Sequence, residues 1–308
     1  MLNYNNHSEQ TKGIIYTMGA FSAWGLLPIY WKQLNTISPM GILANRIIWS
    51  FVFVAVLLSL KKQWGKTWSL FKNLTTVLSL VLSSFIITLN WLIYIWAVNS
   101  NHVVEASLGY YINPLITVLL GILVLHERLD RWQVVSIALA AIGILILTVE
   151  FGKIPWIALS LAITFALYGL AKRLIQADAL TGIALETLIM VPAGLIYLTF
   201  FQGQGAIDLG KINGWTMLLL AGSGVVTATP LLWFAQGAKT IPFATVGFIQ
   251  YVSPTLSLLL GVFLYKESFS MVHVFSFSFI WTAVAIFTIS RLYVVVPAGN
   301  AVKKNIKI

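Results

Sequence analysis

Long apolar runs separated by short polar connections dominate this sequence. A run of roughly 18 or more apolar residues can cross the ~30 Å hydrocarbon core of a bilayer as a helix. These runs lack the ~10-residue apolar–polar alternation of barrel strands, so we expect an all-α membrane protein with ten transmembrane helices. The ten runs cover residues 13–31, 40–60, 74–97, 103–125, 132–149, 154–171, 181–201, 215–236, 243–265 and 271–290.

The composition supports a membrane protein and excludes several kinds of chemistry. Hydrophobic residues make up 59% of the 308 residues and charged residues 9%, whereas an average soluble domain has ~45–50% and ~25%. The absence of cysteine excludes disulfides, thiolate metal sites and cysteine nucleophiles. We find no phosphate-binding G-x-x-x-x-G-K-[ST] sequence, no metal cluster and no nucleophile–base set. We therefore expect no cofactor, no metal, no ATP hydrolysis and no enzymatic activity.

The distribution of Lys and Arg predicts the orientation of the chain. Fourteen of the nineteen fall in connections or tails on one side, among them Lys172, Arg173 and Lys239; four fall on the other side. This bias predicts a multi-pass protein of the inner (plasma) membrane with both termini in the cytoplasm. The net charge of +10 then reflects topology and attraction to the anionic lipid bilayer, and we expect no nucleic-acid partner.

The chain repeats itself at an offset of 140 residues. YINPLITVLLGILVLHE (111–127) aligns without a gap with YVSPTLSLLLGVFLYKE (251–267), and the shared Tyr, Pro, Gly and Glu carry the match. The offset also aligns the first five runs with the last five. Because five is odd, the second half would be inverted, as in many secondary transporters. The expected parts are a tail at 1–12, five-helix repeats at 13–149 and 150–290, and a basic tail at 291–308.

Three ionisable residues lie within or near the ends of the predicted spans, where a charge costs several kcal/mol unless it has a partner, water or a solute. Arg46 and Glu186 occupy the same repeat position. Arg46 could bind an anionic group, form an ion pair or extend to the interface. Glu186 could carry a proton, bind a cation or form a structural pair. We expect the two to flank a solute in a central cavity, with Glu105 as resting partner of Arg46 or as an interfacial charge.

Two prolines occupy matching positions in the fourth and ninth runs. Pro114 and Pro254 would free the backbone carbonyls four residues earlier and place polar groups beside them. This pairing favours a lined cavity, although a plain kink is the alternative. The candidate cavity residues on these helices are Tyr110, Tyr111, Asn113, Gln250 and Tyr251.

The third run carries a polar and aromatic stretch. Asn90 and Tyr94 stand beside Trp91 and Trp96. We interpret Asn90 and Tyr94 as lining for amphipathic or aromatic solutes, and the alternative is the interfacial belt of Trp and Tyr.

Several segments resemble a known family. NWLIYIWAVNSNHVVEASLGYYINPL (90–115), RIIWS (46–50), ALETL (184–188) and GFIQYVSPTL (247–256) are similar to the RarD branch of the EamA-type drug/metabolite transporter superfamily. The resemblance implies ten helices in two inverted five-helix repeats, an inner-membrane location and transport, mostly export, of small solutes. The chain departs from the family pattern at Asn45, where a His is usual, and at His126, where a Gly is usual.

The leading hypothesis is a secondary transporter that exports a small-molecule substrate by alternating access. A passive facilitator or channel and a non-transporting scaffold are the alternatives. The substrate, the coupling ion, the direction and the formation of a homodimer stay open.

The topology can be tested with reporter fusions. A fusion at residue 150 should report the outer side and a fusion at residue 308 the cytoplasm, because the Lys and Arg bias sets the orientation. Matching results at the two positions would contradict the inverted five-plus-five arrangement.

Overall fold

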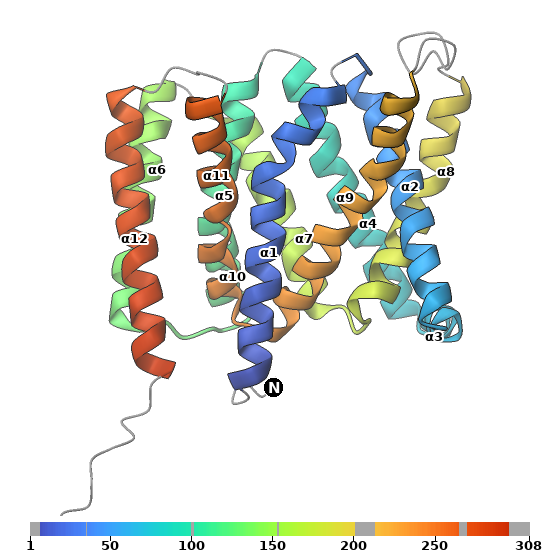
Figure 1. The fold of residues 1–308 in the computed structure, drawn as a ribbon. Coiled ribbons are helices and arrows are strands. Elements are labelled where there is room, and N and C mark those ends of the chain that lie inside the picture. Colours follow the sequence, from blue (N-terminus) through green and yellow to red (C-terminus); the bar gives the residue numbers. More distant parts are fainter. Residues whose placement is uncertain are drawn as a thin grey trace, which may run out of the picture. The chain divides into compact units, whose positions relative to one another are not determined.

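The computed structural model describes residues 7–34, 36–99, 102–152, 154–200, 213–264 and 270–295. Within these ranges the protein is entirely helical (Figure 1). The long helices are α1 (His7–Trp31), α2 (Pro39–Leu60), α4 (Leu74–Asn99), α5 (Val103–Leu123), α6 (Arg131–Phe151), α7 (Trp156–Leu174), α8 (Ala179–Phe200), α9 (Gly214–Thr240) and α12 (Met271–Val295). Between α2 and α4 lies the short α3 (Trp64–Ser69).

The all-helical membrane fold predicted from the sequence is confirmed. Nine segments of the described chain are long and apolar enough to span a bilayer. The remaining predicted span coincides with α5, whose apolar part is Leu108–Leu123. The run at 243–265 is divided into α10 (Phe243–Ile249), α11 (Val252–Leu259) and a π-helical turn at Leu260–Leu264.

The helices form two compact units. One comprises residues 128–153 and 269–308, in which α6 packs on α12. Their axes approach at Gly143, where a side chain would meet the backbone of Ser276 and the side chain of Ile280. Such small residues allow close packing of membrane helices.

The other unit comprises residues 1–127 and 154–268. Here α1 packs on α9 and α4 packs on α7, while α5 packs on α7 and α1 packs on α11. A shift of 140 residues places α1 on α7 and α9 on α4, so the α1–α9 contact corresponds to the α4–α7 contact. The same shift makes the α5–α7 contact correspond to the α1–α11 contact. A duplicated sequence would generate such an exchange of partners, although the assignment of 13–149 and 150–290 as inverted repeats stays a prediction.

Backbone-to-backbone approaches hold the centre of this larger unit together. Gly224 of α9 lies against the backbone of Trp49 and Ser50 on α2. The Ser50 hydroxyl donates a 3.3 Å hydrogen bond to the Gly224 carbonyl. Gly247 of α10 similarly faces the carbonyl of Pro114 on α5. A Cβ would not fit at either contact, so glycine sets the spacing of these helices.

Candidate functional site

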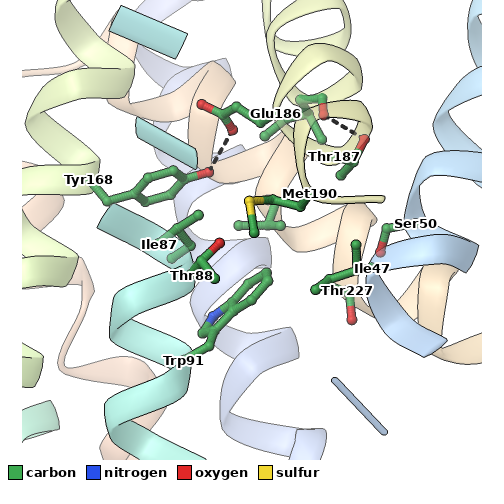
Figure 2. Close-up of a pocket in the computed structure, with 12 residues that line it drawn as sticks. Ile47, Ser50, Ile87, Thr88, Trp91, Tyr168, Glu186, Thr187, Met190 and Thr227 are labelled. Atoms are coloured by element: carbon green, nitrogen blue, oxygen red, sulfur yellow. Dashed lines mark hydrogen bonds between the residues drawn. The ribbon is translucent and has the colours of Figure 1, made fainter. Parts of the chain in front are cut away.

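A small cavity lies between α2, α4, α7, α8 and α9 of the larger unit (Figure 2). Its volume is about 30 Å³, which is room for only about one or two water molecules. Ile, Leu, Met and Trp side chains make up half of its lining. The polar lining residues are Ser50, Thr88, Tyr168, Glu186, Thr187 and Thr227.

Glu186 brings a carboxylate to the cavity wall from α8. The side chain is only 4% exposed. One oxygen accepts a 2.6 Å hydrogen bond from the Ser83 hydroxyl of α4, and the other accepts a 3.5 Å bond from the Tyr168 hydroxyl of α7. Figure 2 shows the Tyr168 ring pointing at this carboxylate. The second oxygen also forms an ion pair with the ammonium of Lys172.

Lys172 belongs to the interior of the protein. The Lys and Arg pattern predicts Lys172 in a connection, and this placement is wrong. The residue lies within α7, is 3% exposed and pairs with Glu186. Its Nζ atom is also 5.3 Å from the centre of the Tyr168 ring. Because Tyr168 and Lys172 are four residues apart on a helix, they share a face and meet Glu186 together.

Sequence reasoning missed Lys172, Tyr168 and Ser83 as members of this site. A Lys near a helix end ordinarily belongs to a connection, and Ser and Tyr are common in membrane helices. The available signal was that α7 and α8 are consecutive, with Lys172 close before the connection and Glu186 close after it. Neighbouring helices with opposite charges near their shared end are candidates for a buried pair.

A second ionic contact joins the ends of α7, α9 and α10. Arg173 donates hydrogen bonds to the carbonyls of Ala238 (2.9 Å) and Ile241 (2.5 Å), and lies 3.5 Å from Glu127. The Glu127 carboxylate in turn accepts bonds from the N–H groups of Phe243 (2.6 Å) and the next residue (2.8 Å). Glu127 therefore caps the N-terminus of α10, a favourable place for an anion.

The connection between α7 and α8 carries a further pair, Lys66 with Asp178. Burial alone would raise the pKa of Asp178, but hydrogen bonds from Lys66 and Thr181 more than offset burial and hold this pKa below its ordinary value. Lys239, also assigned to a connection from the sequence, lies instead within α9 and donates to the carbonyl of Ala177.

Arg46 occupies a different, aromatic environment on α2. The centre of its guanidinium group lies 4.3 Å from the Trp91 ring and 5.2 Å from the Trp31 ring. Its Nε atom is buried and has no hydrogen-bond partner among the described residues. Tyr94 and Tyr110 are close enough to interact with its charge and contact each other edge to face at 6.0 Å. These contacts stabilise a cation by ring electrostatics.

The predicted pair of charges is thus divided between two environments. Glu186 lines the cavity, whereas Arg46 is not among the described lining residues and touches Trp91, which does line it. At the cavity, the basic partner of Glu186 is Lys172. The side chain of Glu105, the predicted resting partner of Arg46, lies outside the described residues.

Two further predicted residues bond to α7. The Asn90 amide donates to the Leu161 carbonyl (2.9 Å) and the Thr164 hydroxyl (2.8 Å), and the Asn113 amide donates to the Ala162 carbonyl (2.7 Å). Neither side chain lines the cavity described above. Both connect helices of the first half of the chain to the second.

The helix that contains Pro254 differs from the expectation of a freed carbonyl. Pro254 lies in the first turn of α11, where proline is tolerated. The Gln250 carbonyl, expected to be free, accepts a 3.1 Å bond from Ser253. Pro114 lies inside the continuous helix α5.

Side chains beside the two prolines bond between helices rather than to the cavity. The Gln250 amide is hydrogen-bonded to the Thr117 hydroxyl at 3.2 Å. The Tyr111 hydroxyl donates a 3.3 Å bond to the Pro254 carbonyl. The Tyr251 hydroxyl is buried with no hydrogen-bond partner in the described chain.

The Lys172–Glu186 pair makes a specific stability prediction. Glu186→Leu should destabilise the protein by about 3–5 kcal/mol, because it leaves a buried ammonium without its carboxylate. The double variant Lys172→Met/Glu186→Leu should recover most of this loss, since apolar residues often replace a buried pair at little cost. Thermal unfolding in detergent measures both, and equal unfolding temperatures for the single and double variants would contradict the pairing.

Comparison with known proteins is consistent with this arrangement. The model of the EamA-like transporter family matches the chain twice, at residues 11–149 and 153–289. The transporter YojE of Bacillus subtilis strain 168 is 48% identical and covers 93% of this chain and 96% of its own length. The protein RarD of Salmonella typhi is 41% identical over 93% and 98% of the two chains, and RarD of Escherichia coli K12 is 39% identical over 93% and 97%.

A solved crystal structure shares the fold, with a TM-score of 0.68 and 18% sequence identity, over 91% of this chain and 98% of that chain. The resemblance inferred from the sequence motifs is confirmed by the family match and the RarD-named relatives. The multiple apolar helices of the chain and its transporter relatives show that it is a multi-pass membrane protein. The chain belongs to the EamA-like transporter family.

Proposed function

We propose that this transporter exports a small solute across the inner (plasma) membrane by alternating access, with both termini in the cytoplasm. The proposal takes its direction from the family resemblance and its orientation from the Lys and Arg bias. It includes no cofactor, no enzymatic step and no nucleic-acid partner. The partners are the lipid bilayer and the solute, and a homodimer stays open.

The observation that carries this proposal is the small cavity with a carboxylate in its wall. Both halves of the chain contribute to it, α2 and α4 from the first and α7, α8 and α9 from the second. A cavity of about 30 Å³ excludes a metabolite, so a solute can bind only when these helices move apart. Movement about a central site is how transporters with repeated halves work.

The same observation weakens the alternative of a passive channel. A channel needs a continuous polar path, whereas here the cavity has room for only about one or two water molecules and half of its lining residues are apolar. Tight glycine contacts between α2 and α9 also close the centre of the unit. A scaffold would have no need for a buried charge at an internal cavity, because such a charge is costly to maintain.

Metabolite profiling tests export. Cells overproducing the protein should release more of at least one small solute than cells lacking it, which should retain that solute. The Lys172→Met/Glu186→Leu variant is the matched control, because it should fold but has lost the charge at the cavity. The solute should then be transported by proteoliposomes containing the wild type and not by those containing the variant.

Unchanged profiles, or equal release by wild type and variant, would contradict the proposed function. Accumulation of the solute inside overproducing cells would show import instead of export, and the proposed transport site would still stand.

A further inference from the structure

Glu186 supplies the charge that the cavity offers to a solute. Among the described lining residues, Glu186 and Tyr168 are the ionisable ones, and the others are apolar or carry neutral hydroxyl groups. Because the Glu186 side chain is buried, little water screens its carboxylate, which therefore attracts a cation strongly. The lining therefore favours positively charged solutes over anions.

The protein already holds an ammonium group against the same two residues. The Lys172 ammonium pairs with the Glu186 carboxylate and lies 5.3 Å from the Tyr168 ring centre. A carboxylate next to an aromatic ring is a common way to bind ammonium and quaternary ammonium groups. Lys172 is itself not among the lining residues, so a solute in the enlarged cavity would approach Glu186 and Tyr168 from the other direction.

We infer that the solute is an organic cation with an apolar or aromatic body, and that its cationic group binds Glu186 in competition with Lys172. This inference rests on the proposed transport function and names its substrate class. Trp91 and Met190 provide an aromatic and a polarizable surface for the body of the solute. The hydroxyls of Thr88, Thr187 and Thr227 can accept hydrogen bonds from a primary or secondary amine.

The surrounding charges set the strength of this competition. On α7, Lys172 and Tyr168 face Glu186, and on α4 the neutral Ser83 does. From α9, the charge of Lys239 also acts on Glu186 and Lys172. From α2, Arg46 touches the cavity-lining Trp91. Asp178, in the connection between α7 and α8, also acts on Lys239, but it does not line the cavity. Glu186 is therefore the lining anion that a cationic solute must share, and Lys172 is the bound competitor.

The first test uses the unmodified protein in detergent at pH 8.5. Radiolabelled benzyltrimethylammonium, a permanent cation with an aromatic ring, should bind saturably and be displaced by the unlabelled cation. Excess benzyl alcohol, which is neutral, and excess benzoate, which is anionic, should not displace it. Absence of saturable binding would overturn the inference, and displacement by benzyl alcohol or benzoate would contradict it by showing that the site recognises the aromatic ring and not the positive charge.

Variants at Lys172 provide the sharper test. Lys172→Met should bind benzyltrimethylammonium at least about tenfold more tightly at pH 8.5, because the internal competitor is gone. The variant should tolerate the change, since the Ser83 and Tyr168 hydroxyls still donate hydrogen bonds to Glu186.

Two controls separate the possible explanations. Lys12→Met removes an exposed lysine that pairs with Glu9, and it should leave the affinity unchanged. The double variant Lys172→Met/Glu186→Leu should bind no benzyltrimethylammonium while unfolding at nearly the wild-type temperature. Weaker or unchanged binding by Lys172→Met, or retained binding by the double variant, would contradict the inference.

Binding and transport fail independently in these experiments. If the wild type releases a neutral or anionic metabolite and does not bind the cation, the substrate class is wrong and the transport function stands. If it binds the cation at Glu186 but moves no solute in cells or proteoliposomes, the site is correct and the transport function is wrong.

Discussion

The buried ion pair between Lys172 and Glu186 constrains the centre of the larger helical unit. Two charges removed from water repay their desolvation only when both are paired and hydrogen-bonded. Satisfying Glu186 requires α7 to present Lys172 and Tyr168 on one face and α4 to present Ser83. The rotations of α4, α7 and α8 are thereby linked, and the cavity lies where these three helices meet α2 and α9. The cavity and the pair therefore form one structural feature.

Packing around this feature combines close contact with polar attachments. Glycines such as Gly224 let helix backbones touch, while Asn90 and Asn113 bond to carbonyls of α7. At the ends of α7 and α9, Arg173 and Glu127 connect to the start of α10. The polar attachments can be broken and remade with small helix movements, because each involves a few directional bonds rather than a broad apolar interface.

The spans could be predicted from the sequence because the bilayer fixes both the length and the polarity of a crossing helix. The family could also be predicted, since its motifs stand in continuous segments. The partner of Glu186 could not, because it depends on which face α7 turns toward α8. Lys172 lies near a helix end, where the positive-inside rule assigns a Lys to a connection. Gln250 and Asn113 were chosen as polar residues within spans, yet they bond to neighbouring helices.

The most direct test of a central, alternately exposed cavity is the accessibility of Thr187, which lines it. The chain contains no cysteine, so Thr187→Cys introduces a single reactive thiol. A membrane-impermeant thiol reagent should label it from outside in right-side-out vesicles and from inside in inverted vesicles. Ala166→Cys, on α7 at a buried position away from the cavity, should stay unlabelled in both. Labelling of Thr187→Cys from one side alone, or from neither, would contradict alternating access to this cavity.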